Sequence, residues 1–302
     1  MIPSERSETV SGRWTACEVK GCRAAAGIAI VGRMSMHDTP RSLTRVAVDA
    51  QSLRQLYDAP EILRVVNVWD AVSARVVSDL PGTTAIATAG HGIAASHGYP
   101  DGERIPFDLM IASLERIVGA TELPVTADLD GGFGDAGEAV RRAIGVGVCG
   151  ANIEDQMRPL RESIDVMQAA VRAGQQEDVA FVLNARTDAL LKAGDRPRSE
   201  AIAEAITRGR AYLGAGAHCV FVPGVLNADE AGALVAAIGI RKVSVIGLPG
   251  ALSAAEYEKL GVARISYGPM PQNVALTALK RLGESLLDDG VIPEDTEKLN
   301  NF

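Results

Sequence analysis

The chain has 302 residues, of which 47% are hydrophobic and 23% are charged, and its formal net charge is −8 at pH 7. This composition is typical of a soluble globular enzyme and excludes a disordered chain. Long blocks of Lys or Arg and apolar runs of roughly 18 residues are both missing, so we expect no nucleic acid and no membrane among its partners.

The first 48 residues differ from the rest of the chain. They are rich in Arg, Ser and Ala and show no sustained hydrophobic period. We predict a disordered N-terminal extension, or a segment that precedes the true start codon. The apolar run from Ala24 to Val31 has the character of a weak signal peptide without a cleavage region. Residues 49–302 are predicted to form the catalytic domain.

From residue 49 onward, short apolar runs alternate with amphipathic helical patterns. The strand-like runs are 64–69, 84–88, 125–129, 150–153, 180–184, 219–222, 242–246 and 263–266. The helical patterns are 52–58, 71–80, 107–119, 136–145, 164–174, 199–214, 228–238, 254–260 and 273–287. Eight strands that alternate with helices pair in parallel through right-handed crossovers. We predict an α/β fold, a (β/α)₈ barrel, with an open doubly wound sheet as the alternative.

Two carboxylates end the third predicted strand, where barrel enzymes carry their chemistry. Asp128 and Asp130 are two residues apart, so they face the same side of the strand. Like charges so placed raise each other's pKa unless a cation lies between them. The alternative role, capping the next helix, is already filled by Asp135, which has Glu138 three residues later. We predict a metal site for Mg²⁺, or for Mn²⁺, because the ligands are all oxygens.

Charged residues also end the next two strands. Glu154 is predicted to join the metal shell, or else to form a buried ion pair with Arg186. A guanidinium is costly in an apolar strand unless it has a purpose, and its planar fork suits a substrate carboxylate. A structural ion pair to Glu154 or Asp188 is the alternative. We take Glu154 and Arg186 as candidate catalytic residues.

The loops between these strands carry further candidates. Asp101 lies in a Gly- and Pro-rich stretch and is either a turn former or a metal ligand. His91 and His97 are candidates for acid–base work, or polar groups at the barrel mouth. Residues 156–163 form either a lid or a solvated loop, with Arg158 and Arg161 as candidate anion contacts.

The four cysteines show no zinc-site spacing. Cys149 and Cys219 lie in apolar strand-like runs, where buried and inert thiols are expected, whereas Cys17 and Cys22 lie in the N-terminal segment. This pattern fits a reducing compartment, and we predict a cytoplasmic protein.

Together these motifs resemble those of the isocitrate lyase/phosphoenolpyruvate mutase superfamily. The resemblance rests on residues 67–71, 94–103, 126–134, 152–155 and 184–188, in that order. It implies a (β/α)₈ barrel with an extra C-terminal helix that is swapped between subunits of a homo-oligomer, a tetramer or a dimer.

The resemblance also implies how the site works. Mg²⁺ would be held directly by Asp128, and mostly through water by the other metal-site acids, Asp130, Glu154 and Asp101. The candidate substrate-binding residues are Ala89, Gly90, His91, Asp70, Arg186 and Arg158. The substrate would be a small anionic 2-oxo acid or a phosphonate.

Departures from the family pattern reduce the number of reactions that the resemblance allows. Isocitrate and methylisocitrate lyases carry a Lys-Arg-Cys-Gly-His motif after strand four, whose Cys is the general acid. Residues 156–161 contain no Cys, and the lysine-bearing loop of the mutases is missing as well. His91 replaces a small residue that is usual in this branch, and it either narrows the pocket or supplies a new acid, which makes it a candidate catalytic residue.

These departures leave three functions open. The leading prediction is a Mg²⁺-dependent lyase or decarboxylase that cleaves a C–C bond in a small 2-oxo or 2-hydroxy carboxylate through an enolate. One alternative is P–C chemistry like that of phosphoenolpyruvate mutase or phosphonopyruvate hydrolase. The other is a protein that binds 2-oxo acids without turnover.

Overall fold

The computed structural model describes residues 41–299. Most of the predicted N-terminal extension, including the run Ala24 to Val31 and Cys17 and Cys22, lies outside the described residues. Helix α1 (Leu43–Asp58) is capped by the side chain of Ser42. Residues 43–48 therefore belong to a helix of the folded domain, whereas the sequence had assigned them to the extension and had placed the helix at 52–58.

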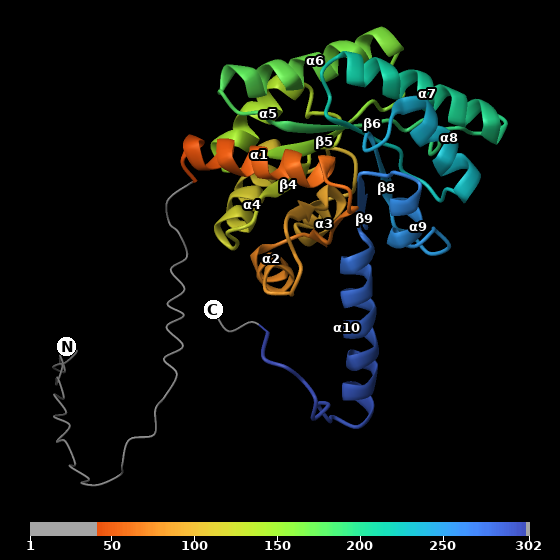
Figure 1. Cartoon of the computed structure of the whole chain (residues 1–302). Helices are drawn as coiled ribbons and strands as arrows, with labels where there is room; N and C mark the ends of the chain where they lie inside the picture. Colours follow the sequence, from red (N-terminus) through yellow and green to blue (C-terminus); the bar gives the residue numbers. More distant parts are fainter. Residues whose placement is uncertain (1–40, 300–302) are drawn as a thin grey trace, which may run out of the picture. The chain divides into compact units, whose positions relative to one another are not determined.

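The sheet is a parallel barrel (Figure 1). The first strand segment is interrupted at Val66, and its two halves pair with β9 and with β3, at opposite ends of the strand order. One extended segment thus closes the sheet, and the predicted (β/α)₈ barrel is confirmed. The strands are β1 (Leu63–Val65), β2 (Asn67–Val68), β3 (Ile86–Thr88), β4 (Val125–Asp128), β5 (Gly150–Glu154), β6 (Val182–Arg186), β7 (Cys219–Phe221), β8 (Val243–Ile246) and β9 (Arg264–Ser266).

Most helices follow a strand and pack around the outside of the barrel, whereas the last one, α10, projects away from it (Figure 1). They are α2 (Ala71–Ser78), α3 (Gly90–Ser96), α4 (Phe107–Gly119), α5 (Ala136–Gly145), α6 (Leu160–Gln176), α7 (Arg198–Gly214), α8 (Ala228–Ile238), α9 (Ala254–Lys259) and α10 (Met270–Asp288). Helix α3 was not predicted, because it is short and contains two glycines, which are weak helix formers. None of the described helices is long and apolar enough to cross a membrane.

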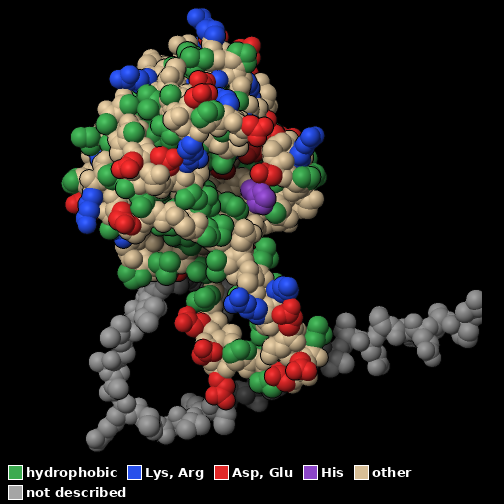
Figure 2. All heavy atoms as spheres, turned by 90° about the vertical axis from the view of Figure 1, so that its right-hand side faces the viewer, with side chains coloured by type: hydrophobic (Ala, Val, Ile, Leu, Met, Phe, Trp, Pro, Cys, Tyr) green, Lys and Arg blue, Asp and Glu red, His purple; other side chains and the backbone are tan. Residues whose placement is uncertain are grey.

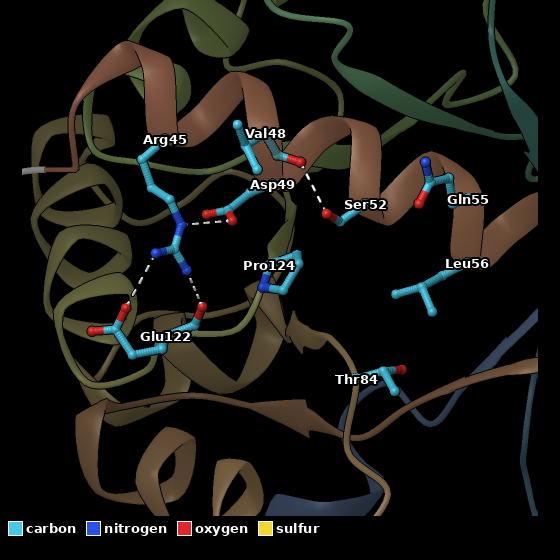
Figure 3. Close-up of a pocket in the computed structure, with 9 residues that line it drawn as sticks. All are labelled: Arg45, Val48, Asp49, Ser52, Gln55, Leu56, Thr84, Glu122 and Pro124. Carbon is cyan, nitrogen blue, oxygen red and sulfur yellow. Dashed lines mark hydrogen bonds and ion pairs between the residues drawn. The ribbon is translucent and has the colours of Figure 1, made fainter.

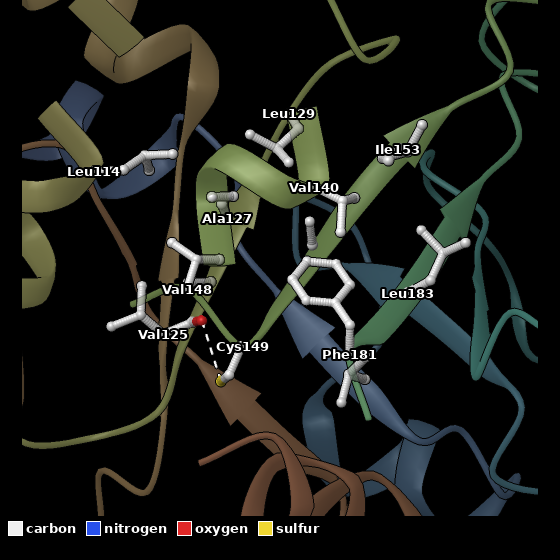
Figure 4. Packing of buried hydrophobic residues seen from close by; sticks show 14 of the residues in the cluster. Leu114, Val125, Ala127, Leu129, Val140, Val148, Cys149, Ile153, Phe181 and Leu183 are labelled. Carbon is white, nitrogen blue, oxygen red and sulfur yellow. Dashed lines mark hydrogen bonds between the residues drawn. The ribbon is translucent and has the colours of Figure 1, made fainter. Parts of the chain in front are cut away.

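The core lies between the strands and the surrounding helices. Leu129, Ile153 and Phe181 are among the buried side chains that pack together around β4 and β5 (Figure 4). Cys149 and Cys219 are also fully buried, and burial raises the pKa of each thiol to about 12. The prediction of buried, inert thiols is therefore confirmed for these two residues.

Helix α1 covers the end of the barrel where the strands begin. Asp49 on α1 accepts hydrogen bonds from Arg41 at 2.9 Å and from Arg45 at 2.8 Å. A pocket of about 530 Å³ lies beside this helix, and Thr84 and Pro124, which precede β3 and β4, line its other side (Figure 3). Barrel enzymes carry their chemistry at the opposite end, so this pocket belongs to the stabilising face of the fold.

Candidate active site at the carboxyl end of the barrel

Asp128 and Asp130 converge at the carboxyl end of β4. A Cβ atom on Gly90, the first residue of α3, would lie 3.3 Å from Oδ2 of Asp128 and 3.4 Å from Oδ1 of Asp130. Both carboxylates therefore reach the same point, and only a glycine fits there without crowding. The Gly90 amide donates a long hydrogen bond of 3.4 Å to Asp128 Oδ2.

The loop after β4 holds this geometry with a strained backbone. Asp130 and Phe133 adopt φ values of 47° and 51°, in the left-handed region that disfavours residues with a side chain. Two hydrogen bonds keep them there: the Phe133 amide donates to Glu103 Oε1 at 2.5 Å, and the Asp130 carbonyl accepts from the Glu154 amide at 2.8 Å. The strain of about 1–3 kcal/mol for each such residue is characteristic of functional sites.

The acids of this cluster resist ionisation. Burial raises the pKa of Asp130 to about 8, and the neighbouring charges of Asp128 and Glu154 add to the effect. Burial likewise raises the pKa of Asp128 and brings that of Glu154 to about 7, although Arg186 opposes the shift in both. On the face shown in Figure 2, acidic side chains gather around a hollow with a histidine at its rim.

A divalent cation fits this donor set. Among residues 41–299, no three Asp, Glu, His or Cys side chains are placed to hold a metal ion on their own. Mg²⁺ needs no such cage, since it usually binds through one or two carboxylates and keeps several waters or substrate oxygens. The convergent pair Asp128 and Asp130 meets that requirement, and a cation between them would relieve their mutual repulsion.

Arg186 stands beside the acid cluster at the end of β6. Its Nη1 lies 2.9 Å from Glu154 Oε2, and its Nε donates to Asp188 Oδ1 at 2.8 Å. Both ion pairs that the sequence offered as structural alternatives are therefore present. The side chain nevertheless remains 21% exposed, so that part of the guanidinium is accessible to a ligand. Asp188 is also paired with Lys192, at 3.0 Å.

Three candidates in the segment after β3, His91, His97 and Asp101, separate into different roles. His91 Nδ1 lies 3.4 Å from Asp101 Oδ2, and both side chains are exposed. Asp101 is close enough to the acid pair for its charge to contribute to the raised pKa of Asp130. His97 instead shares a hydrogen bond of 3.0 Å with Ser113 on α4, and therefore has a structural partner.

Asp70 and Ala89 have evident roles in the backbone architecture. Asp70 is the N-cap of α2 and accepts a hydrogen bond of 2.7 Å from the Ser73 amide. Ala89 is buried immediately before α3, and its amide donates to the Val68 carbonyl at 3.0 Å. Ala89 thereby sets the position of Gly90 at the acid pair.

The segment after β5 is short and firmly held. Helix α6 begins at Leu160, so only residues 156–159 of the predicted 156–163 loop lie outside a helix. Arg158 Nη2 donates to Gln156 Oε1 at 2.7 Å, and a Cβ on Gly131 would lie 2.8 Å from that nitrogen. Arg158 therefore packs on the glycine-rich loop beside Asp130. Arg161 lies in α6, is exposed and pairs with Asp165.

Two residues that support the site were missed in the sequence, although both lie inside its motifs. Asp155 is fully buried and accepts hydrogen bonds from the amides of Met157 and Asp188 and from Tyr212 Oη. Glu103 holds Phe133, as described above. Both residues bind backbone amides of the site loops. A strand-end or loop acid carries no sequence signal that separates this role from metal binding.

Residues 53–287 match the family model of phosphoenolpyruvate phosphomutase. The chain belongs to this family. The predicted membership of the isocitrate lyase/phosphoenolpyruvate mutase superfamily is thereby confirmed. The protein is an enzyme, a lyase or a mutase.

Curated relatives and solved structures agree with this assignment. The chain is 31% identical over 260 residues to 2,3-dimethylmalate lyase of Eubacterium barkeri, which covers 80% of this chain and 86% of that enzyme. A protein of Burkholderia cenocepacia J2315 assigned as a phosphonomutase is 38% identical, with a TM-score of 0.74 over 78% of this chain and 99% of that one. The oxaloacetate acetylhydrolase structure with bound oxalate is 26% identical, with a TM-score of 0.75 over 87% and 93%.

Proposed function

We propose that the protein is a Mg²⁺-dependent lyase or decarboxylase that cleaves a C–C bond in a small 2-oxo or 2-hydroxy carboxylate. The observation that carries this proposal is the convergence of Asp128 and Asp130 on Gly90, beside the Arg186–Glu154 pair. A buried pair of like charges next to an accessible guanidinium suits a cation together with an anionic substrate.

The residues of the site divide the work. A bound cation would polarise the 2-oxo group and stabilise the negative charge that develops as the bond breaks. Arg186 would bind a substrate carboxylate with the exposed part of its guanidinium. Glu154 has a pKa of about 7, close to neutrality, as proton transfer requires. His91, which is exposed beside Asp101, is the second candidate for proton transfer.

A P–C bond reaction is the second candidate. Two observations favour it: the 38% identity to a protein assigned as a phosphonomutase, and the position of Arg158 on the glycine-rich loop. Arg158 would then contact the phosphonyl group of the substrate.

A substrate screen separates the two reactions. Oxaloacetate, methylisocitrate, substituted malates and phosphonopyruvate would each be incubated with the protein and Mg²⁺. Formation of a 2-oxo acid product from a carboxylate supports the lyase. A new ³¹P signal from phosphonopyruvate supports P–C chemistry, and retention of full activity after chelation of divalent cations would contradict both.

We also propose a homo-oligomer in which α10 packs against a neighbouring copy. Leu276, Leu279 and Leu287 lie on one face of α10 at helical spacing and are each more than half exposed. An apolar stripe of this kind is characteristic of an interaction surface. Light scattering tests the proposal, since Leu279→Glu is expected to lower the molecular mass of the assembly without unfolding the barrel.

A further inference from the structure

A chain of hydrogen bonds crosses the barrel interior below the acid cluster. Ser244 Oγ on β8 donates to Asn184 Oδ1 on β6 at 2.9 Å. Asn184 Nδ2 donates in turn to Asn152 Oδ1 on β5 at 2.8 Å. Arg264 Nη1 on β9 donates to the same Asn152 oxygen at 2.9 Å. All four side chains are buried. In each of these hydrogen bonds the donor faces toward Asn152, so that donation along the network ends at Asn152 Oδ1.

This direction leaves only one orientation for the Asn152 amide. Arg264 carries donors alone and can never accept a hydrogen bond. Because Arg264 fixes Asn152 Oδ1 as the acceptor, Asn184 must present its own NH₂ group to that oxygen, which leaves Asn184 Oδ1 to accept from Ser244. A flipped Asn152 would place its own NH₂ group against two donors, with the loss of both hydrogen bonds among buried side chains. Oδ1 therefore faces down the barrel and Nδ2 faces the other way.

Asn152 Nδ2 opens toward the acid cluster. Within residues 41–299 this nitrogen has no hydrogen-bond partner. It is also absent from the set of unpartnered polar atoms that are fully buried, so some of its surface is accessible to solvent or to a ligand. Asn152 is in register with Asp128 on the neighbouring strand, and Glu154 follows two residues later on the same face. The free amide donor of a side chain that is only 6% exposed thus borders the space between these acids.

Arg264 adds a fixed positive charge to the floor of the site. It is 1% exposed and has no carboxylate within ion-pair distance in the described part of the chain. An unpaired buried charge is costly unless another charge offsets it. Burial raises the pKa of Asp128, and Arg264 is among the positive charges that oppose this rise. The positive charge of Arg264 therefore interacts electrostatically with Asp128 in the acid cluster.

We propose that Asn152 Nδ2 donates a hydrogen bond to an oxygen of the anionic substrate, and that Arg264 and Asn184 are positioning residues that fix this donor. The ligand class is a 2-oxo acid, through a carboxylate or 2-oxo oxygen. This inference rests on the proposed function, since it needs the same anion in the same site.

Asn152→Asp is the sharpest variant for a test. The aspartate keeps an oxygen for Arg264 and Asn184 and gives Arg264 a charged partner, so the fold is retained. It replaces the free NH₂ group with an oxygen and adds one negative charge, so the ¹⁵N measurement below is needed beside the affinity. Ser244→Ala is the matched control, because it removes a buried polar group from the far end of the same chain and leaves both donors to Asn152 in place.

Calorimetry with oxalate at saturating Mg²⁺ measures the effect. Asn152→Asp is expected to bind oxalate at least about tenfold more weakly than the wild type, whereas Ser244→Ala stays within about threefold. Arg264→Lys keeps a charge that only donates and is expected to bind more tightly than Arg264→Gln, which permits the amide to flip. In ¹⁵N spectra, the side-chain amide signal that disappears in Asn152→Asp should shift when oxalate is added to the wild type.

The outcomes separate this inference from the proposed function. If the wild type binds no oxalate with Mg²⁺, the proposed function fails and takes the inference with it. If the wild type binds and Asn152→Asp binds equally well, or if the Asn152 amide signal does not move, the inference alone is overturned. Equal affinities of Arg264→Lys and Arg264→Gln would overturn the role of Arg264.

Discussion

Buried acids at the two ends of the barrel have neighbours of opposite charge. At the end where the strands begin, Asp49 is buried but is paired with both Arg41 and Arg45. At the carboxyl end, Asp128 and Asp130 face each other, and burial together with like charge raises the pKa of Asp130 to about 8. The first arrangement satisfies charge and stabilises the fold, whereas the second leaves negative charge in need of a ligand.

Backbone strain follows the same division. Seven non-glycine residues of the described chain have positive φ, and five of them, Glu103, Asp130, Phe133, Gln156 and Met157, lie in loops at the carboxyl end. The other two lie in turns that precede β6 and β8. Each strained residue costs about 1–3 kcal/mol of stability, and strain of this kind is characteristic of functional sites. Its concentration at the carboxyl end supports the placement of the active site there.

Substitution of one acid at each end gives the largest expected contrast. Asp128→Asn should lower activity at least about 100-fold, because a metal ion contributes several kcal/mol to transition-state stabilisation. Its melting temperature should stay the same or rise, since a buried repulsive charge is removed. Asp49→Asn should keep its activity but lose about 3–5 kcal/mol of unfolding free energy, because it weakens a buried ion-pair network. Kinetics and thermal denaturation measure both variants. The comparison would be contradicted if Asp128→Asn lost stability while Asp49→Asn lost activity.

Arg186 tests whether the accessible guanidinium serves the substrate. Arg186→Gln is expected to lower kcat/KM by about 100-fold, in the range that a lost charge-assisted hydrogen bond to a bound anion produces. Arg198→Gln is the matched control, since Arg198 pairs with Glu230 on the surface, where such ion pairs contribute about 0–1 kcal/mol. Steady-state kinetics with the substrate from the screen measure both, and an equal loss in the two variants would reject the role of Arg186.

The raised pKa values of the acid cluster predict how pH acts on the metal-free protein. Asp130 and Glu154 have pKa values of about 8 and 7 in the fold, above those of exposed carboxyls, so the folded state holds protons that the unfolded state has released. The stability that these groups contribute is therefore lost as the pH rises through 7 and 8. Mg²⁺ affinity should rise over the same range, by up to about tenfold per pH unit for each proton released. Denaturation and metal titration at several pH values test this; a pH-independent affinity would contradict it.

Gly90 should give the smallest effect. In Gly90→Ala, the added methyl would lie 3.3 Å from Asp128 Oδ2, tighter than an ordinary contact, and would spread the two carboxylates. We expect a weakening of Mg²⁺ binding by about tenfold or less. Gly145→Ala is the control at the end of α5, where a Cβ meets open space, and should be neutral or stabilising by up to about 1 kcal/mol. Calorimetry with Mg²⁺ separates the two, and equal affinities would show that the crowding is harmless.

Much of the fold was readable from the sequence because hydrophobic period and turn residues are local signals. The runs around Val125, Gly150 and Val182 are apolar on both faces, as buried parallel strands require. Helix α1 began earlier than predicted, because the buried ion pairs of Asp49 make a polar stretch part of the helix. Helix α3 was not predicted, because Gly90 and Gly92 give it a low helix propensity. Tertiary contacts stabilise this helix, and they cannot be read from the local sequence.

The sequence by itself placed Asp128, Asp130, Glu154 and Arg186 at strand ends, since the period of a strand and the order of a barrel decide which residues meet at its mouth. Only the tertiary structure decided what each polar group contacts. Arg186 touches both of its candidate partners, Asp155 binds loop amides, and Arg264 reaches Asn152 across 112 positions of the chain. Hydrogen-bond partners inside a barrel come from strands far apart in sequence, so closure of the sheet alone determines them.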